Sequence, residues 1–373
     1  GSLVAVLVMC LLPNAGSFGM AVSTAMIFGL VSLMFLDTSI NMAMQPFKMM
    51  VGDMVNEKQK GLAYSIQSFL CNAGSLVGFL FPFIFTWIGI SNIAPQGVVP
   101  DSVIYSFYIG AAILILCVIY TTVKVKEMPP AEYAEYHGIT EEEEKEKINM
   151  VKLLIKAPKA FWTVGLVQFF CWFAFMFMWT YTNGSVAANV FDAPTVETAV
   201  NGVSKVMLDT KSIQYQDAAD WVGVLFAVQA IGSVLWAVCI PLFKDRKLIY
   251  SLSLVLGGLG FISTYFVHNQ YVLFISFLLI GCAWAAMLAL PFTILTNALS
   301  GGHMGTYLGL FNGTICIPQI VAASLGGSIL ALFTPKGMLP PEINMLVMAG
   351  VMLIIGAVCV YLIKETKGEQ TKA

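Results

Sequence analysis

Residues 20–51, MAVSTAMIFGLVSLMFLDTSINMAMQPFKMMV, form a largely apolar run with charged or amide side chains at four positions. The four are Asp37, Asn41, Gln45 and Lys48, at spacings of four, four and three. On a helix these spacings place all four on one stripe. Charged residues are costly at bilayer depth, so they usually face a bundle interior or a water-filled cavity that carries substrate or ions. The run therefore predicts a membrane-spanning helix with one stripe facing a pathway.

The composition of the whole chain is that of a polytopic membrane protein. Over 373 residues it is 58% hydrophobic and 11% charged, with a mean hydropathy of +0.82, whereas soluble domains carry about 25% charged residues. The net charge of −2, without a basic patch, argues against a nucleic-acid partner. The eight cysteines lie in apolar runs without a C-x-x-C pair, so they indicate neither a disulfide framework nor a metal site.

Motifs of enzymes and ATP-driven pumps are absent from the sequence. It contains no H-E-x-x-H, no Walker loop, no G-x-S-x-G and no Cys/His cluster. The histidines His137, His268 and His303 fall in expected loops or at helix ends, far apart in the chain. We therefore expect no enzymatic activity, no cofactor and no bound metal.

Windows of about 20 apolar residues, the length that spans a bilayer, divide the chain into about ten segments. The first begins inside an apolar run without a charged leader, so we expect the chain to lack its original N-terminus. The segments cover residues 1–17, 20–51, 61–90, 103–124, 160–183, 219–243, 247–267, 270–299, 304–333 and 342–363.

Basic residues orient these segments. Most of them fall on alternate connections, which the positive-inside rule assigns to the cytoplasm together with the C-terminus. Only Lys205, Lys211 and Lys336 fall on the opposite side. Residues 184–218, on that opposite side, are expected to form an outward loop of mixed polarity.

A polar stretch divides the segments into two groups. Residues 127–158 are expected to be a cytoplasmic linker between an incomplete N-terminal half, residues 1–126, and a six-helix half, residues 159–373. The sequences around Pro46 and Pro291 are similar to each other, and repeated halves are a common plan of secondary transporters. Because four segments precede the linker and six follow it, we expect two helices to be missing.

Asp37 has the sharpest functional interpretation. A carboxylate desolvated in a helix bundle has a raised pKa, so it can bind and release a proton near physiological pH. The alternative is a structural aspartate that hydroxyl groups of neighbouring helices satisfy. Lys48 is ~16 Å from Asp37 along the helix axis, which is too far for the two side chains to pair directly. It could equally be a lysine that extends to the cytoplasmic edge.

Amides and aromatic rings on helix faces are candidates for substrate contacts. Aromatic rings pack on the C–H faces of a sugar, whose hydroxyl groups need paired donors and acceptors. Each candidate also has an ordinary interpretation as a helix-packing or interfacial residue. Trp179 and Tyr181, near the expected end of their helix, are interpreted as interface anchors. The predicted substrate-binding residues are Asn41, Gln45, Lys48, Tyr64, Asn72, Gln168, Trp172, Asn312 and Gln319.

The stripe around Asp37 resembles the fourth helix of the glycoside–cation symporters of the major facilitator superfamily, in particular of their sucrose-transporter branch. That branch carries the pattern D-x-x-N-N-x-x-Q-G-P-x-R-A-L-x-A-D. Asp37, Asn41, Pro46 and Asp53 stand at matching spacing, and Lys48 takes the place of the family's Arg. Lys48 therefore holds the position of a functionally important residue by this resemblance.

Two further stretches carry the same resemblance. GTYLGLFN at residues 305–312, followed by PQ at 318–319, resembles the family signature G-x-x-x-G-x-x-N-x-x-x-x-x-P-Q. KDRK at residues 244–247 is similar to the superfamily's cytoplasmic D-R loop.

The resemblance implies an all-α membrane protein of the major facilitator fold, with about ten transmembrane helices of an expected twelve. It implies proton-coupled symport of a disaccharide or other glycoside into the cell, with Asp37 as the proton-coupling residue. Sodium coupling is an open alternative, and a membrane-embedded sensor is a less favoured one. The expected partners are the sugar, the coupling cation and membrane lipid. The expected state is a monomer in the plasma membrane, or in the inner membrane of a bacterium.

Overall fold

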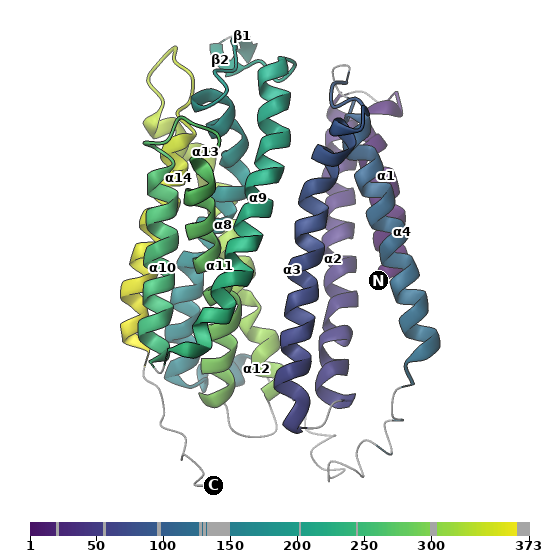
Figure 1. Cartoon of the computed structure of the whole chain (residues 1–373), viewed down its shortest axis with the longest axis vertical. Helices are drawn as coiled ribbons and strands as arrows, with labels where there is room; N and C mark the ends of the chain where they lie inside the picture. The colour runs from purple at the N-terminus through teal and green to yellow at the C-terminus, as the bar shows by residue number, and fades with distance from the viewer. Residues whose placement is uncertain are drawn as a thin grey trace. The chain divides into compact units, whose positions relative to one another are not determined.

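The computed structural model describes ten stretches of the chain, and these form two compact units built mainly from long helices (Figure 1). Unit 1 comprises residues 1–144 and unit 2 residues 145–373. The described residues are 1–19, 22–54, 57–94, 98–126, 129, 132, 150–200, 203–243, 245–298 and 304–363.

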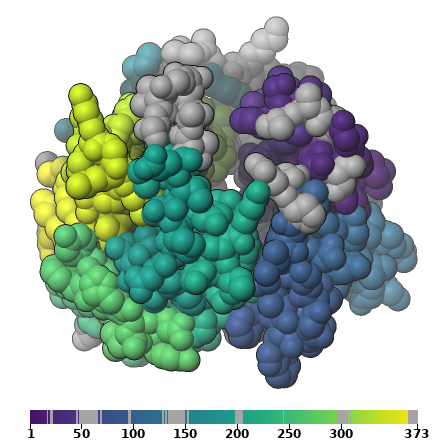
Figure 2. Space-filling model, turned by 90° about the horizontal axis from the view of Figure 1, so that it is seen from above, coloured from purple at the N-terminus to yellow at the C-terminus, as the bar shows by residue number. Residues whose placement is uncertain are grey.

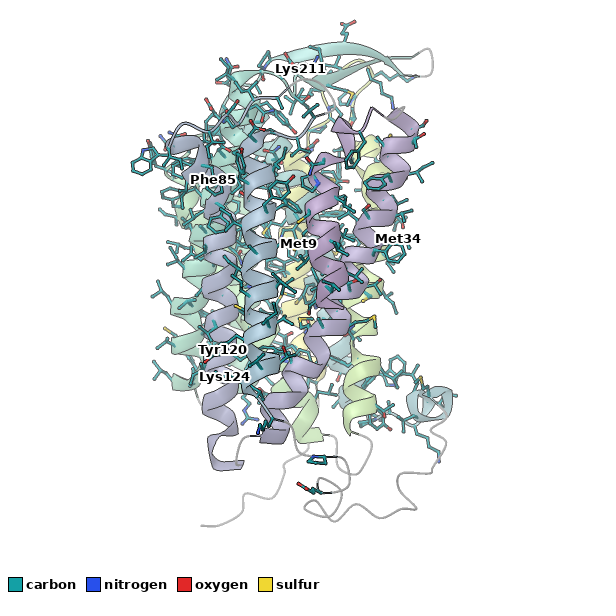
Figure 3. All side chains as sticks on the ribbon, turned by 90° about the vertical axis from the view of Figure 1, so that its right-hand side faces the viewer. Met9, Met34, Phe85, Tyr120, Lys124 and Lys211 are labelled. Atoms are coloured by element: carbon teal, nitrogen blue, oxygen red, sulfur yellow. The ribbon has the colours of Figure 1, made fainter. Side chains whose placement is uncertain are left out.

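Unit 1 contains four α-helices in its described part. The α-helices are α1 (Ser2–Leu11), α2 (Val22–Met54), α3 (Glu57–Trp87) and α4 (Asp101–Lys124), and the short 3-10 helix η1 (Leu12–Ser17) follows α1. α1 packs against α2 and α4, and α3 packs against α4. Small residues such as Ala5 and Ala111 are buried at these contacts. Large apolar side chains point outward instead: Met34 is 62% and Tyr120 67% exposed (Figure 3). Such a surface suits lipid.

Unit 2 contains the remaining described helices and a β-hairpin. Its elements are α7 (Met150–Ile155), α8 (Lys159–Asn189), β1 (Thr195–Val200), β2 (Val203–Leu208), α9 (Ile213–Cys239), η2 (Ile240–Leu242), α10 (Arg246–Ser263), α11 (Leu273–Ala298), α12 (Met304–Phe311), α13 (Gly313–Phe333), α14 (Ile343–Cys359) and η3 (Val360–Leu362). The strands are antiparallel, with Thr195 opposite Leu208 and Val200 opposite Val203.

Capping side chains define where two of these helices begin. The Ser212 hydroxyl accepts a hydrogen bond from the backbone N–H of Tyr215 at 3.3 Å, at the start of α9. The Asp245 carboxylate accepts from the backbone N–H groups of Lys247 and Leu248 at 2.9 and 3.1 Å, at the start of α10. Both residues satisfy donors that a helix leaves unpaired at its first turn.

α8 is the central helix of unit 2. It packs against α9, α11, α13 and α14, and its buried residues lie on every side. A helix that is apolar all round is stable where other helices surround it. Phe161, Phe175 and Phe177 are among the largest fully buried side chains of the unit. α8 therefore fixes the positions of the helices around it.

Glycines let the helices of unit 2 approach closely. A Cβ atom at Gly258 of α10 would lie 2.8 Å from the carbonyl oxygen of Gly350 on α14, and one at Gly350 would lie 2.6 Å from the carbonyl oxygen of Gly258. At Gly281 of α11, an added Cβ would lie 2.7 Å from the backbone nitrogen of Ser233 on α9. Such small-residue contacts are the usual way in which membrane helices associate.

The expected loop at residues 184–218 is wrong in its extent and form. α8 continues to Asn189, α9 begins at Ile213, and the β1–β2 hairpin lies between them. The apolar windows missed the hairpin because its short strands alternate polar and apolar residues. We call the end of unit 2 that carries the hairpin the hairpin end; Figure 2 looks onto it.

The expected segment 304–333 is two helices. α12 ends at Phe311, and α13 begins at Gly313 after Asn312. The backbone oxygen of Asn312 accepts from the backbone N–H groups of Ile315 and Cys316 at 3.0 and 3.2 Å. The break therefore keeps backbone hydrogen bonds at the start of α13.

Nine helices of the described residues are long and apolar enough to cross a membrane, and Ser2–Gly16 forms a shorter apolar helix. This agrees with the expected helix count and confirms a multi-pass, helical membrane protein. The spans are Ser23–Met44, Leu70–Trp87, Asp101–Lys124, Lys159–Asn189, Ile213–Leu242, Arg246–Ser263, Leu273–Leu295, Gly309–Phe333 and Ile343–Leu362.

Candidate functional site

In unit 1, Asp37 and Asn41 lie one turn apart on α2 and interact with each other. The Asn41 side-chain amide donates to the Asp37 carboxylate at 3.2 Å and to the Asp37 backbone oxygen at 2.9 Å. Asn41 is partly buried, whereas the Asp37 side chain is exposed. The expected desolvation of this carboxylate is therefore not provided by the described residues.

The other predicted residues of unit 1 give less information. The side chains of Gln45, Lys48 and Tyr64 lie outside the described residues, although their backbones belong to α2 and α3. Asn72 is partly buried on α3. Their predicted role in substrate binding stays a prediction.

In unit 2, Gln168 is a buried polar residue of α8, nine residues after the start of that helix. Its side chain is 1% exposed, and its amide nitrogen donates to the backbone oxygen of Met287 on α11 at 3.0 Å. The side-chain oxygen of Gln168 has no hydrogen-bond partner among the described residues. Buried polar atoms are nearly always hydrogen-bonded, so an unpaired acceptor here calls for an explanation.

Trp172 lies one helical turn after Gln168 and has an unpaired hydrogen-bond donor where Gln168 has an unpaired acceptor. It is 9% exposed, and its indole N–H has no hydrogen-bond partner among the described residues. The two residues together hold one unpaired acceptor and one unpaired donor on the same face of α8. A hydroxyl group can donate to the first kind of atom and accept from the second.

Aromatic rings of α8 and α11 surround Trp172. The ring centroid of Trp284, on α11, lies 5.8 Å from that of Trp172, 5.8 Å from that of Trp179 and 4.9 Å from that of Phe175. The Trp172 and Trp179 centroids are 6.4 Å apart. We call Trp172, Phe175, Trp179 and Trp284 the aromatic cluster.

The surroundings of the aromatic cluster are electrically neutral. α8 has no acidic, basic or histidine residue after Lys159, and α11 has none at all. No group of metal-ligating side chains occurs in the part of the chain that the structure describes. An uncharged wall of rings with one free donor and one free acceptor suits an uncharged ligand with both hydroxyl groups and C–H faces.

Asn312 and Gln319 lie on the α12–α13 side of α8. Asn312 precedes α13, and Gln319 is on α13 itself; both are partly buried. α13 packs against α8, where a Cβ at Gly165 would lie 3.0 Å from the Thr314 methyl group. The structure thus brings Gln168 and Trp172 together on α8 and leaves Asn312 and Gln319 on the neighbouring helix.

Sequence reasoning missed Trp284 and misplaced Tyr181. Tyr181 is buried and its hydroxyl lies against Gly326 of α13, so its interpretation as an interface anchor is wrong. Trp179 is 39% exposed and belongs to the aromatic cluster. The misreading of Tyr181 arose because α8 extends to Asn189, beyond its expected end. Trp284 stands alone in an apolar run, so no local pattern marked it.

The comparisons with known proteins agree with this architecture. A sequence model described as Major Facilitator Superfamily matches residues 1–204 and 186–373. Curated protein sequences gave no match. Among solved structures, the inward-open xylose transporter XylE from E. coli is 13% identical, with a TM-score of 0.61 over 98% of this chain and 79% of the transporter.

Two other solved structures are similar. The E. coli fucose:proton symporter FucP is 13% identical, with a TM-score of 0.57 over 96% of this chain and 83% of FucP. A POT family transporter in complex with 5-aminolevulinic acid is 12% identical, with a TM-score of 0.55 over 97% of this chain and 80% of that transporter. These likenesses concern the fold, whereas the family match covers the whole sequence. The chain is a transporter, not an enzyme, and it belongs to the major facilitator superfamily.

Proposed function

We propose that the chain is a proton-coupled symporter that carries a disaccharide or other glycoside into the cell. One observation supports this most: Gln168 and Trp172 hold an unpaired acceptor and an unpaired donor beside the rings of the aromatic cluster. Sugars combine apolar C–H faces with hydroxyl groups that both donate and accept. Transporters with repeated halves bind substrate near the membrane midplane, where helices such as α8 and α11 would contribute.

The neutral wall favours a sugar over a charged substrate. A peptide or an amino acid brings an ammonium group and a carboxylate, and each needs an opposite charge when it leaves water. α8 and α11 offer none near the aromatic cluster. The chain is similar to sugar transporters and to a POT family transporter alike, so this local chemistry is what favours the former.

Asp37 is proposed to bind the coupling proton. It is the carboxylate on the polar stripe of α2, and Asn41 already donates to it. The family pattern matched at Asp37, Asn41, Pro46 and Asp53 supports the sucrose-transporter branch. Asn41, Gln45 and Lys48 on the same helix, with Tyr64 and Asn72 on α3, are proposed substrate contacts of unit 1.

The substrate class is tested by binding to the purified full-length protein. Quenching of tryptophan fluorescence is measured against neutral disaccharides, monosaccharides and charged dipeptides. We expect saturable quenching with at least one neutral disaccharide and none with the dipeptides. Saturable quenching by dipeptides alone would contradict the proposal.

The coupling ion is tested by transport. Uptake of the bound disaccharide is measured in cells that express the full-length protein, with and without a protonophore, in sodium and in potassium buffers. We expect the protonophore to abolish accumulation in both buffers. Accumulation that needs sodium and resists the protonophore would assign sodium as the coupling ion.

A further inference from the structure

Glu342 is a carboxylate at the hairpin end of unit 2, directly before the span Ile343–Leu362. It is the residue from which α14 starts, and its side chain is partly buried. Its carboxylate lies against Gly184 of α8: a Cβ atom at that glycine would collide with both carboxylate oxygens and would lie 2.5 Å from the carboxyl carbon. The start of α14 is therefore docked onto α8 through a group that is normally ionised.

The neighbours of this carboxylate are polar but uncharged. Tyr181 of α8 and Tyr215 of α9 are close enough to interact electrostatically with Glu342. Asn183, next to Gly184 on α8, has a buried side-chain oxygen without a hydrogen-bond partner among the described residues. The tyrosine hydroxyl groups carry no positive charge that would stabilise an ionised carboxylate.

Glu342 forms no ion pair within the described part of the chain, so no cation there neutralises its carboxylate. The lysines at this end, Lys205, Lys211 and Lys336, are exposed. His268, in the connection between α10 and α11, is exposed as well, and its ring nitrogen Nδ1 lies 3.2 Å from the backbone oxygen of Asn189. Tyr181 from α8 and Tyr215 from α9 are thus the titratable groups that face the carboxylate.

A small cavity of about 10 Å³ lies at the same end of the unit, and Ile343, the residue after Glu342, contributes to its wall. Its wall includes the polar residues Ser185, Asn189 and Thr264 and the apolar residues Phe277 and Leu346. That volume is about one water molecule, and a water needs two or more polar partners of this kind. The cavity can hold one water near the start of α14, but Glu342 is not among the residues that line it.

Burial raises the pKa of the Glu342 carboxyl group from 4.5 to about 7. Desolvation penalises the ionised form, and no neighbouring cation offsets that penalty. A carboxyl group with this pKa changes its charge in the physiological range.

We propose that Glu342 is a proton-binding site at the hairpin end of unit 2, and that its carboxyl group is protonated while the start of α14 is docked on Gly184. Loss of the proton leaves a carboxylate buried against Gly184 without a neighbouring cation, so it favours movement of this end of α14 toward water. The role of this step in transport rests on the proposed proton symport, whereas proton binding itself does not.

Infrared spectroscopy of the full-length protein in lipid nanodiscs tests the site. The absorbance of protonated carboxyl groups is followed against pH for the unaltered protein and for Glu342→Gln. We expect a component with a midpoint near the pKa of about 7 in the unaltered protein and its loss in the variant. Persistence of that component in Glu342→Gln would overturn the assignment, and so would its absence from the unaltered protein.

Three further variants test whether loss of the infrared component is specific to the Glu342 carboxyl group and does not result from misfolding. Asp217→Asn removes an exposed carboxylate of α9 and should keep the component. Glu342→Asp keeps a carboxyl group and should keep a component with a changed midpoint. Gly184→Ala pushes the carboxylate away from α8 and should lower the midpoint. An unchanged midpoint in Gly184→Ala would contradict the docked geometry.

Replacement of potassium by sodium completes the test. We expect the same midpoint in both salts, and a midpoint that falls as sodium rises would overturn the proposal in favour of a sodium site. Because the titration needs no sugar, it can succeed or fail independently of the proposed symport.

Discussion

The two units place their polar groups in different ways. In unit 1, Asp37 and Asn41 pair with each other along one helix, and the carboxylate is exposed. In unit 2, Gln168 and Trp172 are buried, uncharged, and each has an unpaired polar atom beside aromatic rings. Buried neutral groups with unpaired polar atoms suit recognition of a neutral substrate. Proton coupling through Asp37 and sugar recognition by Gln168 and Trp172 are therefore separate proposals that separate variants can test.

The packing of the two units differs as well. At Gly29, Gly74 and Gly78 of unit 1, an added Cβ would meet nothing within 4 Å. At Gly258 and Gly350 of unit 2, it would meet backbone atoms of the facing helix. At Gly258 and Gly350, α10 and α14 therefore approach each other through their backbones.

The largest expected effect concerns Asp37. Asp37→Asn removes the proton-binding group and keeps its shape, so accumulation of sugar should be lost completely while exchange of sugar across the membrane persists. Uptake and counterflow of a labelled disaccharide in proteoliposomes measure the two properties. The matched control Asp101→Asn, at the first turn of α4, should accumulate sugar normally. Normal accumulation by Asp37→Asn would give Asp37 a structural role and remove the proposed proton coupling through this residue.

The pH dependence of unit 2 should be the next largest effect. The pKa of Glu342 is about 7 when docked and 4.5 when free, so the docked form binds more protons between these values. The contribution of Glu342 to the free energy of unfolding should therefore be largest below pH 4.5 and should fall as pH rises. Above pH 7 the free energy of unfolding should be lower by about 3 kcal/mol at most.

Thermal unfolding of the protein in detergent at acid and at alkaline pH measures this effect. The unaltered protein should have the lower Tm at alkaline pH, and Glu342→Gln should show a smaller difference between the two conditions. An equal pH dependence in both proteins would show that other groups determine it.

Glycine substitutions should separate the packing of the two units. Gly350→Ala forces a Cβ to within 2.6 Å of the Gly258 oxygen, so α10 and α14 must move apart. We expect a loss of about 2 kcal/mol of stability. Gly78→Ala on α3 meets no neighbour and should be neutral or slightly stabilising. Unfolding by denaturant measures both, and equal effects would contradict the difference in packing.

The smallest expected effect is that of Trp172→Phe. This change keeps an aromatic ring and removes the unpaired indole N–H, so sugar affinity should fall by about 1 kcal/mol, roughly five-fold. Trp221→Phe is the matched control, because its indole N–H already donates to the Gln270 backbone oxygen at 3.2 Å. Fluorescence titration with the sugar measures both variants. Equal affinity losses would remove Trp172 from the recognition site.

Much of the fold could be predicted from the sequence because bilayer thickness sets the length of apolar runs. The helix boundaries agree within several residues along most of the chain, as for α2 and α4. The split at Asn312 and the β1–β2 hairpin were missed because an average over apolar windows does not see a one-residue break or a short amphipathic strand.

The candidate site could be predicted only in part. Gln168 and Trp172 share a face of one helix, so their spacing alone relates them. Trp284 joins them through the packing of α11 on α8, and Glu342 meets Gly184 through the packing of α14 on α8. Contacts between helices far apart in the sequence leave no local pattern. In the sequence, Glu342 looks like an ordinary acidic residue before an apolar helix.

Sugar-driven proton flux tests the central claim most directly. The full-length protein is reconstituted into liposomes that contain a pH-sensitive dye and potassium buffer, and the disaccharide that quenches its fluorescence is added outside. We predict acidification of the interior that depends on the sugar and is absent from Asp37→Asn. Uptake of labelled sugar without acidification, or acidification unchanged in Asp37→Asn, would contradict proton-coupled symport through Asp37.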